Sequence, residues 1–443
     1  MSGIAKLLLD NGFKVSGSDL KEGRATKELQ DMGAQVHIGH RGANIKGANI
    51  VIYSSAISQD NPEMEAAKKT GLTLLKRAQA LAGLMQQKKV ITVTGSHGKT
   101  TTTSLAAHLL FEAGLFPAAA IGGILINIDN NASFGKGEYF VAEADESDGS
   151  FLYYRPNYSI VTNIDYEHLD YYKDFHNELK AFKEFIENTQ GDGCVFACAD
   201  DQNLMALLKD YKRKKVLFGL KNDADIWPKN IKIEGLSSQF DCFYKNKFVD
   251  RFSLFLGGLH NISNALSVIA LGLELGIAIE PIKKALKNFK GARRRLEIKF
   301  KGQDVLVIDD YAHHPSEIKA TLLALKELRR KRIVAVFQPH RYTRTKLLLD
   351  EFGRCFNAAD YVIITDIYPA SEPAIEGISG NSVYQKIKEY SPGKEAVYLP
   401  KAKITTHLLK AIEPFDLVVI LGAGDIVNIS NELVEGLKRK VEA

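Results

Sequence analysis

A glycine-containing loop between an apolar segment and a helical pattern offers the clearest chemistry in the chain. The loop reads Thr94-Gly-Ser-His-Gly-Lys-Thr100, and the segment that precedes it, Lys88 to Thr94, is apolar and β-branched. In phosphate-binding loops the glycines let backbone N–H groups face phosphate oxygens, the lysine reaches the β- and γ-phosphates, and the hydroxyl ligates Mg²⁺. The usual pattern has a glycine where this chain has Val93, so the loop is a shorter variant that Gly95 closes. The sequence predicts a nucleoside triphosphate site made by Gly95, Ser96, His97, Gly98, Lys99, Thr100 and Thr101.

Two polar segments offer ligands for the Mg²⁺ ion that accompanies a triphosphate, since that ion prefers oxygen ligands. Each follows a short apolar strand pattern, and ligands of α/β sheets bind at the carboxyl ends of strands. An acidic loop is often only solvated and a single histidine often packed or on the surface, but both follow the phosphate-loop strand in the order that such sites use. The candidates are Glu143, Asp145, Glu146 and Asp148 after the first strand pattern and His168 after the second.

Strand patterns alternate with helical patterns, which predicts parallel sheets with crossover helices. Three α/β blocks can be separated, with expected boundaries at 1–86, 87–291 and 292–443. In the first we expect a helix over 4–9 and strands over 13–19, 35–38 and 50–56. In the second we expect a strand over 88–94, short strands that open the segments 139–148 and 158–170, and helices over 101–113 and 177–187. In the third we expect strands over 304–309, 332–337, 361–364 and 416–421.

The composition fits a globular protein with several cores. The chain has 443 residues, 45% of them hydrophobic, and a net charge of +5 that is not concentrated in one segment. That charge argues against a dedicated nucleic-acid binder, and the hydrophobic content argues against disorder. No apolar run reaches the roughly 18 residues that a membrane span needs, and the start shows no signal-peptide pattern, so we expect a cytoplasmic protein. The four cysteines lack disulfide or zinc spacing and are expected to be free thiols.

Further segments complete a set of motifs that resembles the Mur ligases of peptidoglycan synthesis over essentially the whole chain. The resemblance is greatest to the members that add L-alanine to UDP-N-acetylmuramate, because Ser147 and the Arg341–Arg344 run match them and not the ligase that recycles whole peptides. Besides the phosphate loop and the acidic motif, the matching segments are Thr162-Asn-Ile, His168-Leu-Asp, Gly258-Leu-His-Asn-Ile-Ser-Asn264, Arg294-Arg295, Asp309-Asp-Tyr-Ala-His-His-Pro315 and Phe337-Gln-Pro-His-Arg-Tyr-Thr-Arg-Thr345.

The resemblance implies three consecutive domains: a Rossmann-like domain for the UDP substrate, a central ATP-binding domain of phosphate-loop type, and a Rossmann-like domain for the amino acid. It also implies ATP-dependent amide formation, in which a substrate carboxylate becomes an acyl phosphate and the amine of L-alanine attacks it. A free carboxylate is a poor acyl donor because oxide would have to leave. The implied cofactors are ATP and Mg²⁺.

The resemblance also implies roles for individual residues. Lys99 and Arg295 would act on the transferring phosphoryl group, and Thr100 with Glu143 would hold a first Mg²⁺. His168 would hold a second, with Glu143 bridging. The adenine would be bound by His260, Asn261 and Asn264, and the ribose by Asp310. The alanine would be bound by Tyr311, His313, Arg341 and Arg344. The UDP substrate would be bound by Asp19, His40, Ser54 and Ser55.

Three alternatives stay open for single residues. Asn261 and Asn264 stand at a helix start and can be capping residues only. His313 or His314 would accept the ammonium proton, unless this adjacent pair only forms a turn before Pro315. Lys183 has the spacing of a carbamylated, metal-binding lysine of some relatives, but a surface lysine is the preferred interpretation.

The start of the chain departs from the family pattern. Relatives carry a strand and a Gly-x-Gly-Gly-x-Gly-type loop before the segment that matches Met1-Ser-Gly-Ile-Ala5. We therefore expect the first domain to lack its first strand, through a misassigned start or a real deletion.

Two other functions compete with the addition of L-alanine. One is a related ligase that attaches another amino acid or a peptide, and the other is a truncated, catalytically silent nucleotide-binding protein. ADP release with UDP-N-acetylmuramate and single amino acids distinguishes the three.

Overall fold

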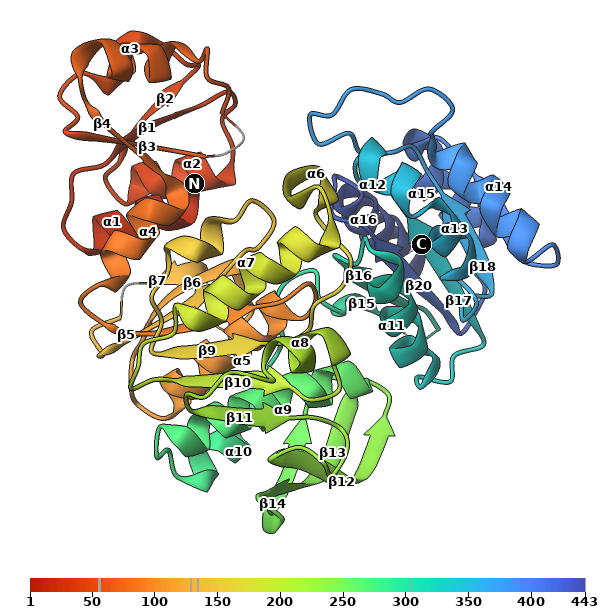
Figure 1. Cartoon of the computed structure of the whole chain (residues 1–443). Helices are drawn as coiled ribbons and strands as arrows, with labels where there is room; N and C mark the ends of the chain where they lie inside the picture. Colours follow the sequence, from red (N-terminus) through yellow and green to blue (C-terminus); the bar gives the residue numbers. More distant parts are fainter. Residues whose placement is uncertain (55–56, 128–129, 134, 303, 443) are drawn as a thin grey trace. The chain divides into compact units, whose positions relative to one another are not determined.

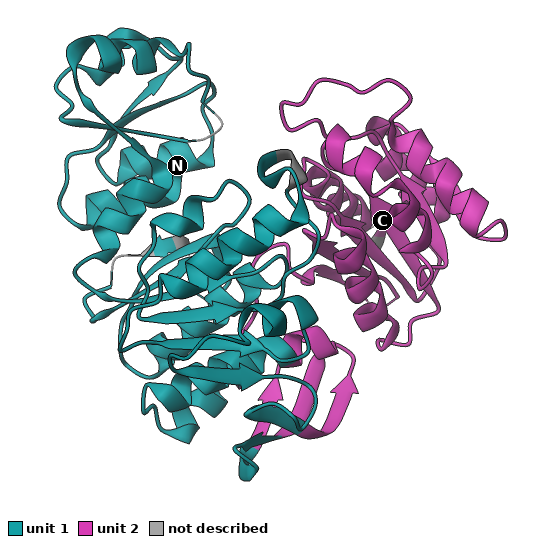
Figure 2. Cartoon of the chain, in the orientation of Figure 1, with its two compact units in different colours: residues 1–228, 242–250, 263–286 teal, residues 229–241, 251–262, 287–443 magenta. Residues whose placement is uncertain are grey.

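The computed structural model describes residues 1–54, 57–127, 130–133, 135–302 and 304–442 (Figure 1). The chain divides into two compact units, shown in Figure 2. The first unit contains residues 1–228, 242–250 and 263–286, and the second contains residues 229–241, 251–262 and 287–443. Within the described ranges, none of the helices combines the length and the apolar character that crossing a membrane requires.

The first 86 residues of the first unit form two small parallel sheets. Strand β1 (Ser16–Asp19) pairs with β2 (Gln35–Ile38), and β3 (Ile50–Tyr53) pairs with β4 (Thr73–Lys76). Each pair is a separate two-stranded sheet. The helices of this part are α1 (Ser2–Asp10), α2 (Arg24–Asp31), α3 (Pro62–Thr70) and α4 (Arg77–Met85).

Helix α3 shows how local sequence sets these bounds. The side chain of Asn61 accepts a hydrogen bond from the Glu63 N–H, and Pro62 opens the helix, where its missing N–H does no harm. The helix ends at Gly71, whose φ of 68° is in the left-handed region that glycine adopts without strain.

A ten-stranded sheet forms the middle of the chain, in the order β14-β13-β12-β11-β10-β9-β5-β8-β6-β7. Strand β5 (Lys89–Thr94) lies between β8 (Tyr139–Glu143) and β9 (Tyr158–Val161) and is parallel to both. Because it is central, its residues from Val90 to Thr94 are buried on both faces, which explains the continuous apolar run. The other strands are β6 (Ala118–Leu125), β7 (Asn130–Ser133), β10 (Cys194–Cys198), β11 (Lys215–Phe218), β12 (Ile226–Glu234), β13 (Ser237–Tyr244) and β14 (Lys247–Leu254).

The helices that follow these strands position the predicted ligands. Helix α5 (Lys99–Glu112) begins directly after the phosphate loop, so the loop connects the carboxyl end of the central strand to a helix N-terminus. Such an end carries unpaired N–H groups and partial positive charge. The remaining helices here are α6 (Leu169–Tyr172), α7 (Phe175–Glu187), α8 (Gln202–Leu207), α9 (Leu259–Glu274) and α10 (Ile279–Asn288).

Most of the second unit is a six-stranded sheet in the order β15-β16-β20-β17-β18-β19. Strand β15 (Glu297–Lys301) is antiparallel to β16 (Leu306–Asp310), and the other neighbouring strands of this sheet pair in parallel. These strands are β17 (Arg332–Phe337), β18 (Tyr361–Ile364), β19 (Glu395–Tyr398) and β20 (Asp416–Leu421).

Helices cover both faces of this sheet. One core joins the sheet to α11 (Pro315–Lys326), α13 (Leu349–Arg354) and α14 (Gly380–Tyr390), and the other joins it to α15 (Lys401–Ala411) and α16 (Val427–Glu442). The short helix α12 (Tyr342–Leu347) carries the second arginine of the predicted amino-acid site.

All four cysteines are buried free thiols, as the sequence predicted: Cys194, Cys198, Cys242 and Cys355.

Candidate functional site

The phosphate loop needs glycine at two positions for different reasons. Gly95 has φ 127°, and a Cβ there would lie 2.2 Å from Thr162 Oγ1. Gly98 has φ 84°, and a Cβ there would lie 2.8 Å from Asn264 Oδ1. Both conformations favour glycine and both sites lack room for a side chain. The loop is therefore held close to the segment after β9 and to helix α9.

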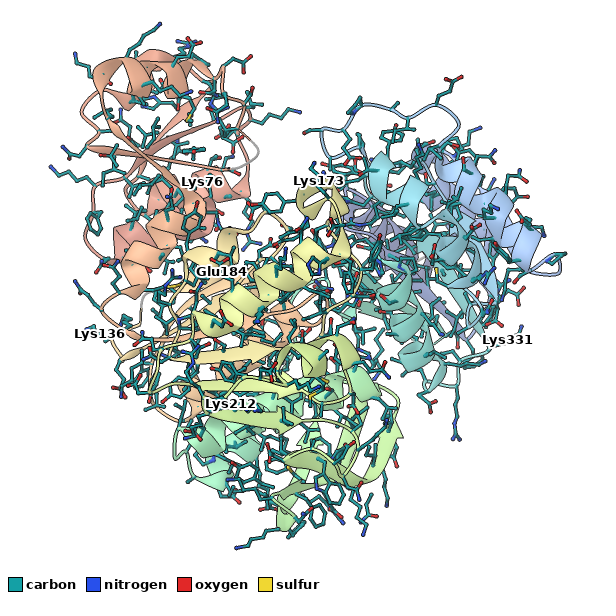
Figure 3. The ribbon with its side chains drawn as sticks, viewed as in Figure 1. Lys76, Lys136, Lys173, Glu184, Lys212 and Lys331 are labelled. Atoms are coloured by element: carbon teal, nitrogen blue, oxygen red, sulfur yellow. The ribbon has the colours of Figure 1, made fainter. Side chains whose placement is uncertain are left out.

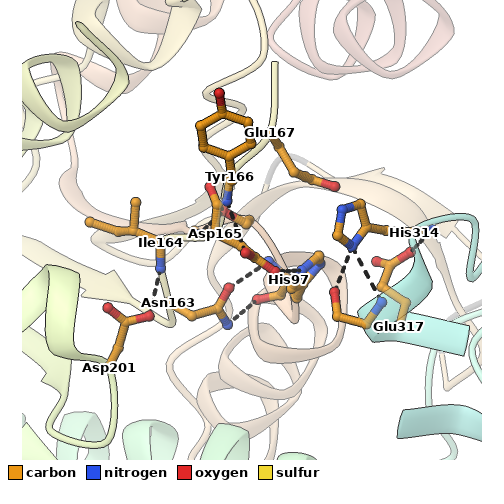
Figure 4. A network of polar contacts seen from close by, with 12 residues as sticks. His97, Asn163, Ile164, Asp165, Tyr166, Glu167, Asp201, His314 and Glu317 are labelled. Atoms are coloured by element: carbon orange, nitrogen blue, oxygen red, sulfur yellow. Dashed lines mark hydrogen bonds and ion pairs between the residues drawn. The ribbon is translucent and has the colours of Figure 1, made fainter. Parts of the chain in front are cut away.

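The turn after β9 fixes the loop through hydrogen bonds to His97 (Figure 4). The Asn163 side chain accepts from the His97 N–H at 2.8 Å and donates to the His97 carbonyl at 3.0 Å. Thr162 Oγ1 also donates to that carbonyl, at 2.6 Å, and the imidazole Nε2 lies 3.1 Å from Asp165 Oδ2. These hydrogen bonds fix the shape of the loop. Sequence analysis included Thr162 and Asn163 in a motif but gave them no role; their position directly after a strand was the available signal.

The Lys99 side chain is hydrogen-bonded within its own loop. Its ammonium donates hydrogen bonds to the carbonyls of Gly95 (2.6 Å) and Ser96 (3.0 Å) and to Glu146 Oε1 (2.7 Å). Burial alone would lower the pKa of this ammonium, but the carboxylates of Glu146 and Asp145 hold that pKa above its ordinary value. Lys99 therefore stays charged at any physiological pH.

Thr100 and Glu143 lie side by side, as the prediction for a first Mg²⁺ requires. Thr100 Oγ1 donates to Glu143 Oε1 at 3.1 Å, and the Gly122 N–H donates to Glu143 Oε2 at 2.9 Å. Desolvation raises the pKa of the Glu143 carboxyl, although Lys99 opposes the shift. A hydroxyl and a carboxylate at one point form an oxygen site of the kind that Mg²⁺ binds.

His168 lies beside two carboxylates that sequence analysis did not assign to it. Its Nε2 is 3.3 Å from Glu146 Oε1 and 3.5 Å from Glu167 Oε2. Among the described residues these three can offer ligand atoms within 4.8 Å of one another, and the group does not include Glu143. Lys183 lies on the exposed side of α7, as the preferred interpretation expected. The predicted bridging role of Glu143 stays a prediction.

The predicted adenine motif lies at the start of α9. Asn261 is buried and its amide donates to the Gly257 carbonyl at 2.8 Å, which is the local turn role that the alternative interpretation allowed. Asn264 is buried next to Gly98 of the phosphate loop. His260, by contrast, is exposed. The three residues thus differ in what they contact, and Asn264 is the one within reach of the loop.

The adjacent residues Arg294 and Arg295 of the second unit have different contacts. Arg294 ties β16 to the loop after β20, because its guanidinium is 3.2 Å from Asp309 Oδ1 and donates to the Gly422 carbonyl at 2.5 Å. Arg295 lies 3.7 Å from Glu317 Oε1, with its guanidinium 5.1 Å from the centre of the Tyr311 ring. The structure therefore separates a structural arginine from the one predicted to meet phosphate.

Both carboxylate oxygens of Asp310 are hydrogen-bonded to the backbone. Its two carboxylate oxygens accept from the N–H groups of Leu296 and Ala312, each at 2.8 Å. Burial raises the pKa of Asp310 to about 6, and Arg295 opposes the shift. The predicted contact with a ribose would use lone pairs that these two bonds leave over.

Tyr311 and His313 of the predicted alanine site belong to a row of aromatic rings in the second unit, which we call the ring wall. The ring centres of Tyr311 and His313 are 5.4 Å apart, those of His313 and His340 are 5.7 Å apart, and His340 stacks on Tyr368 at 5.5 Å. The Arg344 Nη1 lies 3.3 Å from His340 Nδ1. Sequence analysis missed His340 and Tyr368; His340 stands beside the arginine run, which was the available signal.

The two arginines of the run do not share one partner. The Arg341 Nε lies 2.6 Å from Glu372 Oε1, and Thr343 holds the same carboxylate at 2.7 Å. Arg344 instead faces the ring wall. Burial, followed by the positive charge of Arg344, holds the pKa of His313 well below its usual value, so His313 is neutral at pH 7. A neutral imidazole beside a guanidinium can accept an ammonium proton while the guanidinium binds a carboxylate.

The predicted UDP residues lie at strand ends of the first unit. Asp19 ends β1, and its carboxylate accepts from the Lys21 N–H at 3.2 Å. His40 follows β2, and its Nδ1 lies 2.9 Å from Ser18 Oγ, which donates to Glu63 Oε2 at 2.8 Å. Ser54 follows β3, whereas Ser55 lies outside the described residues.

Comparison with known proteins decides the family. Models of the Mur ligase family match three successive parts of the chain: "Mur ligase family, catalytic domain" matches residues 1–89, "Mur ligase middle domain" 93–272 and "Mur ligase, glutamate ligase domain" 294–424. A UDP-N-acetylmuramate–L-alanine ligase of Pelotomaculum thermopropionicum is 45% identical over 440 residues, which cover 99% of this chain and 95% of that protein. The chain belongs to the Mur ligase family.

Other members of the Mur ligase family agree in sequence and in fold. A UDP-N-acetylmuramate–L-alanine ligase of Desulfotalea psychrophila is 44% identical over 98% of this chain and 95% of its own length. The crystal structure of a UDP-N-acetylmuramate–alanine ligase from Thermotoga maritima matches with a TM-score of 0.85 and 31% identity, covering 99% of this chain and 97% of that one. A murein peptide ligase from Psychrobacter arcticus shares the fold, with a TM-score of 0.72 and 24% identity.

Proposed function

We propose that this Mur ligase joins L-alanine to UDP-N-acetylmuramate with ATP, through an acyl phosphate. The observation that carries the proposal is the arginine–histidine wall of the second unit, which suits a small zwitterion because His313 is neutral and Arg344 carries a guanidinium. The phosphate loop of the first unit supports the use of ATP. The relatives with 45% and 44% identity over nearly the whole chain carry that activity in their names, which supports the choice of L-alanine. Peptidoglycan precursor synthesis is the process that this reaction serves.

The chain's own residues would divide the work as follows. The phosphate loop and the N-terminus of α5 would bind the triphosphate, and Lys99 would stabilise the charge on the transferring phosphoryl group. Arg295 would add a second positive charge there. Arg344 would hold the alanine carboxylate, and His313 would accept a proton from the alanine ammonium so that the amine can attack.

Magnesium belongs to the proposal, and the residues fit it. Thr100 and Glu143 present two oxygens 3.1 Å apart, and Glu146 Oε2 is a buried carboxylate oxygen without a hydrogen-bond partner among the residues that the structure describes. Such an orphaned oxygen is what a cation site leaves when no cation is bound. A bound divalent cation supplies charge neutralisation between the substrate carboxylate and the γ-phosphate.

Three further assignments are part of the same proposal. The domains are taken as residues 1–86 for the UDP substrate, 87–291 for ATP and 292–443 for the amino acid. The ligands Asp19, His40, Ser54 and Ser55 are assigned to the UDP side. A cytoplasmic location is supported by the four free thiols, which are typical of reducing compartments.

The test is ADP release by the full chain with UDP-N-acetylmuramate and single amino acids. Release that depends on both UDP-N-acetylmuramate and L-alanine is expected. Release with another amino acid or a peptide but not with alanine would favour a different Mur ligase activity. No release with any acceptor would favour a silent nucleotide-binding protein.

A further inference from the structure

Three neighbouring strands of the ten-stranded sheet end beside one another. Strand β9 lies between β5 and β10 and is parallel to both. The carboxyl ends of parallel strands meet at one edge of a sheet, so the loops after these three strands are neighbours there. The loop after β5 is the phosphate loop, the turn after β9 holds it, and the loop after β10 leads into α8 with Asp201 and Asn203. Neither Asp201 nor Asn203 was part of a predicted site.

The turn after β9 contacts the phosphate loop on both sides of Ile164. On one side, the Asn163 side chain accepts from the His97 N–H at 2.8 Å, and the Asn163 carbonyl accepts from the Ser96 N–H at 3.1 Å. On the other side, the Asp165 N–H donates to Ser96 Oγ at 2.8 Å. The position of Ile164 therefore sets where the partners of the phosphate loop lie.

Asp201 and Asn203 hold both backbone polar groups of Ile164. Asp201 Oδ2 accepts from the Ile164 N–H at 2.9 Å (Figure 4), and Asn203 Nδ2 donates to the Ile164 carbonyl at 3.0 Å. The residue types suit these contacts, because a carboxylate only accepts hydrogen bonds whereas a carboxamide can also donate them. The Ile164 side chain is buried, so this residue is fixed in the core as well as at its backbone.

Asp201 is fixed in turn by the helix that it caps. Its Oδ1 accepts from the Leu204 N–H at 2.8 Å, which caps the N-terminus of α8. One carboxylate thus joins α8 to the turn after β9. The adjacent Asp200 makes the same kind of contact with a different segment, since its Oδ2 accepts from the Leu220 N–H at 2.7 Å. Asp200 therefore offers a matched control for Asp201.

We propose that Asp201 and Asn203 are positioning residues for nucleotide binding, which act on the phosphate loop through Ile164. The inference rests on the proposed function, because it takes the loop to bind the phosphates of ATP. Backbone N–H groups bind phosphate oxygens when they point to a common place, and a loop already held in that shape loses less conformational freedom on binding. Releasing Ile164 loosens the loop in the free protein and weakens nucleotide binding, although neither side chain has to touch the nucleotide.

The variants for the test separate the contact with Ile164 from the cap of α8. Asp201→Ser keeps a capping hydroxyl for α8 but removes the second oxygen, which Ile164 uses. Asn203→Ala removes the donor to the Ile164 carbonyl. Asp200→Ser is the control. Each full chain is titrated with a fluorescent N-methylanthraniloyl derivative of ATP in the presence of Mg²⁺, so the measured affinity needs no ligase activity.

The expected result is a loss of nucleotide affinity that follows the contacts with Ile164. The dissociation constant should rise about fivefold or more in Asp201→Ser and in Asn203→Ala, and at least about tenfold in the double variant. Asp200→Ser should leave it unchanged. In ligase assays the KM for ATP should rise in the same order, whereas the KM for alanine should stay near the parental value.

Melting temperatures separate positioning from a merely structural role. Asp201→Ser and Asp200→Ser should both lower the melting temperature of the ligand-free protein, because each loses a hydrogen bond to the backbone. Only Asp201→Ser should also reduce the further rise that ATP produces. A parental dissociation constant in the double variant, or an equal loss of affinity in Asp200→Ser, would overturn the proposal.

The outcomes also distinguish this inference from the proposed function. Nucleotide binding that weakens as expected, in a protein that releases no ADP with alanine, overturns the proposed function and supports the positioning role. A double variant with parental nucleotide affinity, in a protein that does ligate alanine, overturns the positioning role alone. A parent that does not bind the ATP derivative overturns both.

Discussion

Lys99 and Glu146 form a buried ion pair, with 2.7 Å between Nζ and Oε1 and no exposed surface on the glutamate. The lysine that we propose to act on a phosphoryl group is thus paired with a carboxylate from the loop after β8. The pair holds the ammonium within the loop. Any ligand with phosphate oxygens at this place competes with Glu146 for the same ammonium.

The first prediction concerns Lys99→Ala. Turnover should fall by at least about 100-fold, because a charged donor used in the transition state is lost. The measurement is ADP release at saturating substrates. Circular dichroism and melting temperature serve as controls for the fold, since removing Lys99 also leaves Glu146 unpaired. Lys331→Ala, at an exposed lysine, is the matched control (Figure 3). Near-normal turnover would remove the loop lysine from the mechanism.

The second prediction separates Arg344 from Arg341. Arg344→Ala should raise the KM for alanine at least about tenfold, because a charge-assisted contact to a carboxylate contributes roughly 1.5–3 kcal/mol. Arg341→Ala should raise it less and should instead lower the melting temperature, because the Arg341 guanidinium is 2.6 Å from Glu372. The KM for ATP is the control in both variants. A larger effect on alanine from Arg341→Ala would show that the two assignments are reversed.

The third prediction treats Glu317 as a positioning residue for His313. Its Oε2 accepts from the N–H groups of His313 (3.0 Å) and His314 (3.3 Å), and its Oε1 lies 3.7 Å from Arg295 Nη1. Glu317→Ala should lower kcat about tenfold with a smaller change in the KM for alanine, because the imidazole loses its orientation.

The conservative variant provides the control for that prediction. Glu317→Gln keeps an acceptor at the same place and should recover most of kcat. It also removes a negative charge that raises the pKa of His313, so the acid side of its pH–rate profile should move to lower pH. A lower melting temperature with an unchanged kcat and pH profile in both variants would mean a structural role only.

Buried parallel strands were the part of the fold that sequence could predict best. The expected strands over 332–337, 361–364 and 416–421 coincide with the buried strands β17, β18 and β20, and the one over 35–38 with the more exposed β2. Unbroken apolar runs mark such strands because both faces are covered. Strands β12 to β14 were not predicted, since residues 226–254 mix polar and apolar types. The turn between β13 and β14, with positive φ at Lys245 and Asn246, carries no glycine to mark it.

The site was predictable where one local segment makes it and not where distant segments meet. The phosphate loop follows from strand, glycines and helix, all within a few residues. The contact between Lys99 and Glu146 gave no signal, because the two residues lie 47 positions apart in the chain and only the fold brings them together. The sequence cannot tell which of the adjacent arginines Arg294 and Arg295 pairs with Asp309. The structure shows that it is Arg294, whose φ is 61°. The residue roles themselves stay predictions.

The last prediction is a pH dependence of stability that comes from His340. Burial and the neighbouring Arg344 and Arg341 lower the pKa of this imidazole to about 4. In the unfolded chain the value is near 6.5, so between these values the unfolded state binds more protons and stability falls as the pH falls. From pH 7.5 to pH 5 this one group should reduce the free energy of unfolding by about 2 kcal/mol. His340→Gln should lose that share of the pH dependence, which urea unfolding at the two pH values measures. His407→Gln, which removes another ring from the same unit, is the control and should keep it. An equal pH dependence in His340→Gln and the parent would show that the imidazole is already protonated at pH 5 in the folded protein.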